Sequence, residues 1–253
     1  MSDHLVIDVG NTRLKWGWLA NARLSGQKAV VHLDVDPDTW SRGIFDSTRR
    51  PERILVSNVA GAAMAWNLHR FSQDAWGLEP EFIKPTRTFH DLINGYLNPD
   101  LLGADRWLAV IGAWNLSHGA LCVVDAGTAI KVDSVNAHGQ HLGGLILPGI
   151  RMMRESLLNK THGVGPAMAG SIASTAGVLA NNPIAAVTRG AVVAAAAMAD
   201  RAAQMVEHDT GEHPQIFVTG GDAEIIMASM QSPGSLVPDL VLQGIAELAL
   251  QGE

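Results

Sequence analysis

Cysteine is almost absent from this chain, because Cys122 is the only one among 253 residues. A single cysteine cannot form a disulfide within the chain, so a disulfide-stabilised scaffold is excluded. Cys122 lies inside the apolar run 121–124, where we expect a buried core thiol rather than a nucleophile. The lack of disulfides agrees with a reducing compartment, and we expect the protein in the cytoplasm.

Runs of basic residues and long apolar runs are also missing. The formal net charge is −7 at pH 7, and no polybasic stretch occurs. A net acidic chain disfavours general binding to nucleic acids or anionic membranes, although a small cationic pocket can still hold ATP. The longest run of small apolar residues, 191–199, is too short to span a bilayer, and the first residues lack the basic start of a signal peptide. We therefore expect neither a nucleic-acid partner nor insertion into a membrane.

The sequence contains neither of two common nucleotide-binding patterns, G-x-x-x-x-G-K-[ST] and G-x-G-x-x-G. Their absence argues against a P-loop or a dinucleotide-binding fold. A different pattern occurs twice, as LVIDVGNT at residues 5–12 and as LCVVDAGTA at residues 121–129. Each copy is a short apolar run that ends in Asp, one further residue, Gly and a polar residue, and the copies lie close to half the chain apart. This repetition predicts one phosphate-binding unit built twice.

The repeated pattern places suitable groups for a phosphate and its cation at the end of a strand. A short apolar run bounded by glycine predicts a buried strand, and Asp8 or Asp125 at its end is well placed to bind a hydrated cation. Gly10 and Gly127 allow the backbone to turn tightly and to approach a ligand closely. A single turn of this kind is more often a plain hairpin turn, and the duplication is what favours phosphate binding. Side-chain donors near the turns are Asn11, Thr12 and Thr128.

Two further features extend the pattern. Lys15 lies in segment 13–18, whose alternation predicts the returning strand of a hairpin, and it can supply a point charge for a terminal phosphate. Residues 215–221 form an apolar run that ends in Thr-Gly-Gly before a segment with helical character. This glycine pair allows a flat nucleoside to lie against the backbone, but it is equally a plain connection between a strand and a helix.

Together these motifs resemble the type III pantothenate kinases, members of the superfamily of acetate kinase, sugar kinases, Hsp70 and actin. The resemblance covers almost the whole chain. It implies two similar α/β domains of the ribonuclease H-like, actin-like ATPase type, each a mixed β-sheet flanked by helices, with a nucleotide cleft between them. We place these domains at about 1–118 and 119–253. The motifs are DVGNTRLK at 8–15, GADRW at 103–107, DAGTA at 125–129, GGLILPG at 143–149 and TGG at 219–221.

The resemblance also implies which residues bind the substrates. Asp105 matches the proposed general base that takes the proton from the primary hydroxyl of pantothenate, and phosphoryl transfer requires a carboxylate near that hydroxyl. Asp125 matches the ligand of a monovalent cation, K⁺ or NH₄⁺, and Thr128 matches a contact to the nucleotide phosphates. Without such a motif, an Asp beside an Arg is ordinarily a surface ion pair. ATP and Mg²⁺ are expected at Asp8, Val9, Gly10, Asn11, Thr12, Arg13, Leu14 and Lys15, and pantothenate at Tyr96, Gly103, Ala104, Asp105, Arg106 and Pro183.

Two positions depart from the family pattern. The family usually has Thr-x-Asp where this chain has Lys131, Val132 and Asp133. Either the Lys131 side chain points to solvent, or its ammonium replaces part of the requirement for a monovalent cation. Pro183 stands where the family commonly has a threonine that contacts pantothenate, and the loss of one hydroxyl contact weakens binding by about 1 kcal/mol.

The sequence thus predicts an ATP-dependent pantothenate kinase, which acts in the first step of coenzyme A biosynthesis. Two alternatives are a superfamily kinase for another small hydroxy compound and a nucleotide-binding regulatory protein without efficient turnover. The presence of Asp8, Asp105 and Asp125 favours an enzyme. The alanine-rich segment 183–208 predicts a closely packed helix, either buried within one chain or at a homodimer seam, and the dimeric state of the family favours a homodimer.

Overall fold

The computed structural model describes residues 3–45, 48–160 and 179–251, and these form two compact units. Unit 1 comprises Met1–Ser117 together with Asp239–Glu253, and unit 2 comprises His118–Pro238. The first division lies next to the predicted boundary at 118. The C-terminal segment differs from the prediction, because it belongs to unit 1 and not to the second half of the chain.

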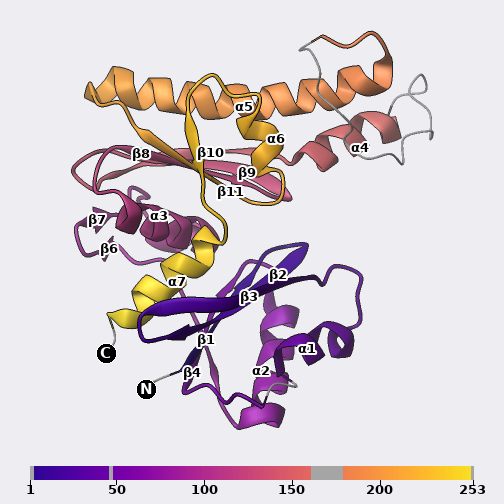
Figure 1. Ribbon diagram of the computed structural model, residues 1–253, viewed down its shortest axis with the longest axis vertical. Helices are drawn as coiled ribbons and strands as arrows, with labels where there is room; N and C mark the ends of the chain where they lie inside the picture. The colour runs from indigo at the N-terminus through magenta and orange to yellow at the C-terminus, as the bar shows by residue number, and fades with distance from the viewer. Residues whose placement is uncertain (1–2, 46–47, 161–178, 252–253) are drawn as a thin grey trace. The chain divides into compact units, whose positions relative to one another are not determined.

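Unit 1 contains a five-stranded sheet with helices on both faces (Figure 1). Its elements are β1 (His4–Val9), β2 (Arg13–Ala20), β3 (Arg23–Val31), α1 (Pro37–Phe45), β4 (Arg53–Asn58), α2 (Ala62–Trp76), β5 (Pro80–Phe82), β6 (Thr88–Phe89), β7 (Leu92–Ile93), the 3₁₀ helix η1 (Pro99–Leu101), α3 (Ala104–Leu116) and α7 (Leu240–Leu250).

Unit 2 contains a second five-stranded sheet. Its elements are β8 (Leu121–Ala126), β9 (Ala129–Val135), β10 (His141–Pro148), α4 (Ile150–Lys160), α5 (Pro183–Thr210), β11 (Gln215–Thr219), α6 (Ala223–Met227) and β12 (Gly234–Leu236).

The two sheets have the same topology. Their strand orders are β3-β2-β1-β4-β5 in unit 1 and β10-β9-β8-β11-β12 in unit 2. In each sheet the central strand pairs antiparallel with the strand that follows it and parallel with the next strand on its other side. Two mixed sheets with matching order and direction confirm the prediction of two similar α/β domains.

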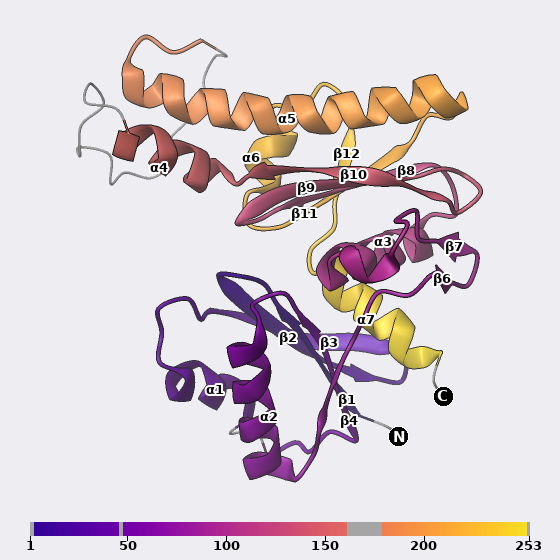
Figure 2. The ribbon, with the colours of Figure 1, turned by 180° about the vertical axis from the view of Figure 1, so that it is seen from behind.

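Helices α1 and α2 cover one face of the unit 1 sheet (Figure 2). Period-2 alternation directs every second side chain of β1 toward this face, including Leu5 and Ile7, which are both fully buried. Aromatic rings fill the space beneath the helices, with Trp40 and Phe71 in edge-to-face contact at 5.6 Å between ring centroids.

The C-terminal helix α7 packs against α3, and both contact the unit 1 sheet. Glycines allow this close helix crossing, because a Cβ added to Gly244 would overlap the carbonyl group of Leu108. A Cβ added to Gly112 would likewise lie 2.6 Å from the carbonyl oxygen of Leu240. This packing is the physical reason that the last helix belongs to unit 1.

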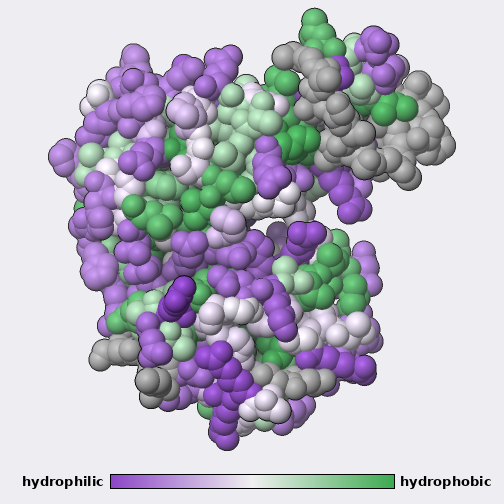
Figure 3. Space-filling model, viewed as in Figure 1, coloured by the Kyte–Doolittle hydropathy of each residue, from purple (hydrophilic) through white to green (hydrophobic). Residues whose placement is uncertain are grey.

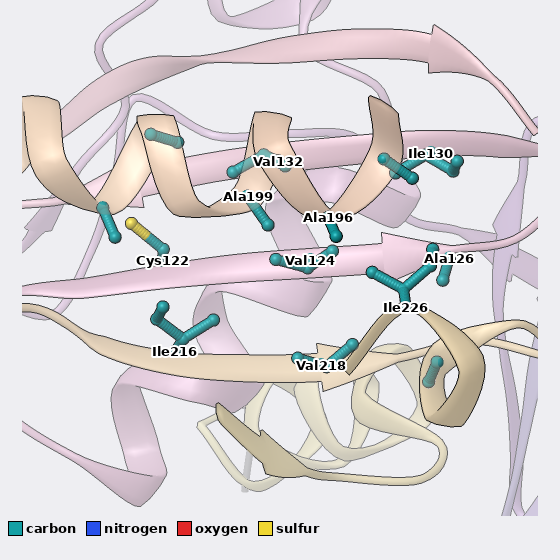
Figure 4. Packing of buried hydrophobic residues seen from close by; sticks show 14 of the residues in the cluster. Cys122, Val124, Ala126, Ile130, Val132, Ala196, Ala199, Ile216, Val218 and Ile226 are labelled. Atoms are coloured by element: carbon teal, nitrogen blue, oxygen red, sulfur yellow. The ribbon is translucent and has the colours of Figure 1, made fainter. Parts of the chain in front are cut away.

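Alanine side chains bring α5 close to the unit 2 sheet, and this core also contains residues of β8, β9, β11 and α6 (Figure 4). Apart from Val192, Asp200 and Val206, every buried residue of α5 is alanine. One face of the predicted alanine-rich helix is therefore buried within the unit, while Val193 and Met205 are exposed. Cys122 lies in this core as a fully buried free thiol, which confirms its prediction.

Helix α5 is also the one helix in the described ranges that is long and apolar enough to cross a membrane by length and composition. Its most apolar window has a mean hydropathy of 1.3, and 33% of that window is buried within the structure. A core helix of alanines that packs on a sheet meets the same criteria. The prediction from the run 191–199 did not identify this long apolar helix, because the apolar composition extends beyond that run.

Candidate functional site

The turn between β1 and β2 carries the first predicted phosphate motif. Asp8, near the end of β1, lies directly across the hairpin from Lys15 on β2. The N–H of Gly10 donates to the carbonyl oxygen of Arg13 at 3.0 Å and closes the turn. His32 braces it from the end of β3, because its Nε2 lies 2.7 Å from the carbonyl oxygen of Gly10. The turn is thus stabilised by one backbone hydrogen bond and by one side-chain contact to its backbone.

Lys15, predicted to bind a terminal phosphate, has a carboxylate partner in this structure. Its Nζ lies 3.1 Å from Oδ1 of Asp239, and both side chains are about one-quarter exposed, at 27% and 25%. A partly exposed ion pair contributes only about 0–1 kcal/mol, so this contact does not prevent Lys15 from turning to a phosphate. Sequence reasoning missed Asp239, because it lies at the start of α7, far from Lys15 in the chain.

The turn between β8 and β9 carries the second motif. Asp125 lies directly across this hairpin from Lys131. The two side chains form an ion pair, with 2.7 Å between Nζ of Lys131 and Oδ2 of Asp125. The N–H of Gly127 donates to the carbonyl oxygen of Ala129 at 3.2 Å and closes the turn beside Thr128. The Lys131 side chain therefore reaches Asp125 and is not simply directed to solvent.

Two distant glycines of unit 2 meet this second turn. The N–H of Gly149 donates to the carbonyl oxygen of Thr128 at 2.9 Å, and a Cβ added there would lie 2.5 Å from that oxygen. Gly220 has a φ of +99°, and a Cβ added there would overlap the carbonyl group of Ala126. The predicted motifs at 143–149 and 219–221 are thereby brought to the end of β8.

The first turn of α3 carries the candidate catalytic group. Asp105 and Arg106 are 9% and 7% exposed, so they are not the surface ion pair that a neighbouring Asp and Arg usually form. The backbone N–H of Arg106 donates to Oδ1 of Asp105 at 2.8 Å. Nη1 of Arg106 donates to the Tyr96 hydroxyl at 2.8 Å, and the guanidinium lies over the Tyr96 ring at 5.5 Å from its centroid. Tyr96, Asp105 and Arg106, all predicted substrate residues, are therefore neighbours.

Gly103 and Ala104 begin this helix, with Gly103 at the N-cap. A Cβ added to Gly103 would lie 2.6 Å from Oδ1 of Asp105. The absence of a side chain at 103 thus leaves room for the observed position of the Asp105 carboxylate. A carboxylate in the first turn of a helix is also favoured by the helix dipole.

Arg87 is a residue of this region that sequence reasoning missed. Its guanidinium donates to three backbone carbonyl oxygens of the Tyr96 loop, those of Asn94 at 3.0 Å, Tyr96 at 2.7 Å and Leu97 at 2.7 Å. Asn94 is buried, and its Oδ1 accepts the N–H of Tyr96 at 3.0 Å. Arg87 and Asn94 therefore fix the backbone that carries Tyr96. Nothing in the sequence linked Arg87 to the segment that carries Tyr96.

Pro183 is the first residue of α5 and is exposed. Asn182 caps the helix, because its Oδ1 accepts the N–H of Ala185 at 2.9 Å. Asn at the N-cap followed by Pro at the first helical position is a favourable helix start. The departure from the family pattern at Pro183 therefore has a local structural explanation. It lies in unit 2, whereas Tyr96 and Asp105 lie in unit 1.

The Cys122 thiol, buried in unit 2, has a raised pKa. Burial raises its pKa to about 11, partly offset by a hydrogen-bonding contact with Ser134. A thiol with this pKa is protonated at neutral pH and is therefore a poor nucleophile.

Comparisons with known proteins identify the family of this chain. A family model described as type III pantothenate kinase matches residues 4–205. A type III pantothenate kinase of Nitrosococcus oceani is 33% identical over 97% of this chain and 93% of its own length, and one of Azoarcus sp. is 36% identical over 97% and 90%.

Solved structures share the fold at lower sequence identity. The ethanolamine utilization protein EutJ from Carboxydothermus hydrogenoformans has a TM-score of 0.59 at 13% identity and covers 98% of this chain and 90% of its own. An activator of 2-hydroxyisocaproyl-CoA dehydratase from Clostridium difficile has a TM-score of 0.54 at 13% identity, with coverages of 99% and 95%. These likenesses show the fold alone. The match of the family model and the identity to its members over nearly the whole chain establish that this chain belongs to the type III pantothenate kinase family.

Proposed function

We propose that this protein transfers the γ-phosphoryl group of ATP to the primary hydroxyl of pantothenate, forming 4′-phosphopantothenate in the first step of coenzyme A biosynthesis. Family membership supports the reaction class and the substrates. The observation that carries the proposal is the group formed by buried Asp105 and Arg106 at the start of α3 and the half-buried Tyr96 that Arg106 contacts. A buried carboxylate in the first turn of a helix, next in sequence to an arginine that donates to a phenol, is suited to bind and deprotonate a small polar acceptor.

ATP and Mg²⁺ are proposed to bind at the strand-end turns. Phosphoryl transfer depends mainly on positioning and on neutralising charge at the β- and γ-oxygens. The residues of unit 1 that supply these groups are Asp8 for the metal, the 9–14 turn for phosphate oxygens and Lys15 as a point charge. Thr128 is the corresponding phosphate contact in unit 2. The donor types present, a carboxylate with hydroxyl and amide groups, fit a hydrated Mg²⁺ and a triphosphate.

Asp105 is proposed as the general base. Its carboxylate accepts the proton of the pantothenate hydroxyl while that oxygen attacks the γ-phosphorus, and the bond from γ-phosphorus to the bridging oxygen breaks to release ADP. Tyr96 and Arg106 are proposed to bind the polar groups of pantothenate, with Gly103 and Ala104 leaving space for it. Pro183 is proposed to contact pantothenate without donating a hydrogen bond, which lowers affinity by about fivefold relative to a hydroxyl donor.

The monovalent cation expected at Asp125 fits these residues poorly. The Lys131 ammonium already lies 2.7 Å from Oδ2 of Asp125. A K⁺ or NH₄⁺ ion bound to this oxygen would have to displace that ammonium or lie beside it. Ions of like charge at such distances repel one another.

A homodimer in the cytoplasm is also proposed. Apolar side chains gather over the adjoining ends of α4 and α5 (Figure 3), where Met152, Leu157 and Ile184 are 46%, 48% and 43% exposed. The groove between these helices has a volume of about 680 Å³ and is lined mainly by apolar residues. Such a surface is suited to a second copy of the chain. Light scattering after size-exclusion chromatography would give a monomer mass if this part of the proposal is wrong.

The kinase proposal is tested by ADP release from MgATP with and without pantothenate. Asp105→Asn is expected to lower kcat by about 10²–10⁴-fold while ATP still binds. Asp74→Asn, the same substitution at an exposed position of α2, is the matched control and should keep wild-type turnover. Mass spectrometry should detect phosphopantothenate as the product.

Other outcomes would select the alternatives. ADP release that requires a different small hydroxy compound would identify a kinase with another acceptor, with Pro183 as the first position to change. ATP binding without turnover of any acceptor would indicate a regulatory protein.

A further inference from the structure

The two hairpins of this chain place a lysine opposite each strand-end aspartate. Asp8 and Lys15 are cross-strand partners in unit 1, and Asp125 and Lys131 are cross-strand partners in unit 2. Directly opposed side chains of an antiparallel pair lie on the same face of the sheet and within reach of one another. The second half of the chain thus repeats the lysine of the first half as well as its aspartate.

The two lysines nevertheless have different carboxylate partners. Lys15 is 3.1 Å from Asp239, a residue of the C-terminal helix, whereas Lys131 is 2.7 Å from its own cross-strand aspartate. The Lys131 and Asp125 side chains are only 17% and 22% exposed. The distance between Nζ and Oδ2 is typical of a charge-assisted hydrogen bond. The Asp125 charge is therefore neutralised by a group of the protein itself.

We propose that the Lys131 ammonium takes the place of a monovalent cation at Asp125, so that ATP binding and turnover by this protein are independent of K⁺. A lysine ammonium is a compact monovalent cation with rotatable donors, tethered here by β9. It supplies one positive charge beside the 127–128 turn, as a bound K⁺ would. The part of this inference that concerns turnover rests on the proposed function, whereas the part that concerns ATP binding does not.

Charge repulsion explains why both cations do not bind together. Two unit charges about 4 Å apart near a protein surface repel strongly enough to weaken the binding of a second cation by roughly a thousandfold. The backbone of Lys131 cannot move away from Asp125, because β9 pairs with β8 on one side and with β10 on the other. At ordinary salt concentrations K⁺ therefore does not compete for Asp125.

The test compares wild type with Lys131→Thr, Lys131→Arg and the control Lys28→Thr. Lys28 is an exposed residue of β3, so the same substitution there leaves Asp125 untouched. ATP affinity is measured by titration calorimetry, and turnover by ADP release. Each measurement is made in potassium chloride and in tetramethylammonium chloride at equal ionic strength. Thermal unfolding of each variant verifies that it is folded.

In wild type and in the Lys28→Thr control, we expect the ATP Kd to differ by less than about twofold between the two salts. Lys131→Arg retains a cation and should behave in the same way. Lys131→Thr should bind ATP about tenfold more weakly without K⁺ and recover when K⁺ is added, because K⁺ can then reach Asp125.

A wild-type protein that requires K⁺ for ATP binding overturns the inference, as does a Lys131→Thr variant whose ATP affinity is unchanged without K⁺. If Lys131→Thr does not fold, the ATP affinity of the wild-type protein in the two salts still tests the inference. Absence of pantothenate phosphorylation in both salts, with ATP binding that ignores K⁺, removes the proposed acceptor but not this inference. Turnover that depends strictly on K⁺ leaves the proposed function in place and removes the role of Lys131.

Discussion

Replacing Arg87 by methionine should weaken pantothenate binding while leaving ATP binding intact. Methionine retains an unbranched apolar stem of similar length but removes the guanidinium. The guanidinium donates to the carbonyl oxygens of Asn94, Tyr96 and Leu97, at 2.7–3.0 Å. These bonds hold the loop that carries Tyr96, whose hydroxyl accepts a hydrogen bond from Arg106 beside the proposed base.

The expected magnitude follows from the exposure of Arg87. A hydrogen bond with a charged donor contributes about 1.5–3 kcal/mol when buried, but Arg87 is exposed, and water partly replaces each lost bond. About 0.5–1 kcal/mol for each of the three bonds gives about 1.5–3 kcal/mol for holding the loop. This corresponds to roughly a 10- to 150-fold change in the population of the ordered loop. The KM for pantothenate should therefore rise by about 10- to 100-fold.

Initial-rate kinetics with each substrate varied in turn provide the assay. The kcat at saturating pantothenate and the KM for ATP should change by less than about threefold, because the loop does not carry the base or the phosphate turns. Hydrogen exchange at the amide of Tyr96, which donates to Asn94, should become faster. Arg53→Met is the matched control, since Arg53 is bonded to Glu81 on the neighbouring strand at 2.7–2.8 Å and does not touch the loop.

An unchanged KM for pantothenate would refute the reasoning that Arg87 positions the Tyr96 loop. Equal rises in the KM values for pantothenate and ATP would also refute it, because they would indicate a general loss of structure. Arg87→Lys separates charge from geometry. The single ammonium group of lysine cannot donate to all three carbonyl oxygens as the planar guanidinium does. The KM for pantothenate should therefore lie between those of wild type and Arg87→Met.

Three further predictions concern single residues. Gly103→Ala should lower kcat by about tenfold or more, because the added Cβ displaces the Asp105 carboxylate. The Cβ does not meet backbone, so the free energy of unfolding should change by less than about 1 kcal/mol. Equal kcat values in wild type and variant would contradict this prediction. Gly220→Ala should lower the free energy of unfolding, measured in urea, by more than about 3 kcal/mol. The φ of Gly220 is +99°, which is unfavourable for alanine, and an added Cβ would overlap the carbonyl group of Ala126. A smaller loss would count against this backbone contact. Because burial raises the pKa of Cys122 from 9.0 to about 11, the folded state favours the protonated thiol. The resulting stability is fully present below pH 9.0 and is lost as the pH rises to about 11, by about 2–3 kcal/mol. Cys122→Ala should lack this part of the alkaline decline, and equal declines in urea unfolding would contradict the buried-thiol explanation.

Much of the fold could be predicted because its signals are local. The apolar run before Asp8 and the alternation after Gly10 predict a hairpin without reference to any distant residue, and the same is true of 121–135. The alanine-rich run after Pro183 likewise predicts a helix from its own composition. The duplicated pattern also determined that the halves would share one fold, since equal local patterns favour equal hairpins.

The main site residues were named by the family resemblance, and their roles stay predictions, whereas the contacts that support them could not be predicted from the sequence. Arg87 meets the backbone carbonyls of residues 94–97, and a backbone carbonyl leaves no trace in a sequence. Gly149 and Gly220 belong to predicted motifs, but only the structure places them against the turn after Asp125. No periodicity records that kind of approach, because it depends on where other elements lie.

The sequence by itself determined the two hairpins, the acids at their ends, the buried cysteine and the family to which the chain belongs. Only the tertiary structure decided that the C-terminal helix returns to unit 1, that Lys15 meets Asp239, and that Lys131 turns toward Asp125 and not to solvent. The physical reason is that strands, helices and turns are specified by hydrogen-bonding patterns and by the spacing of apolar residues, which both involve only a few neighbouring residues. The partner of a helix face or of a long charged side chain is instead selected by packing and electrostatics among residues far apart in the chain.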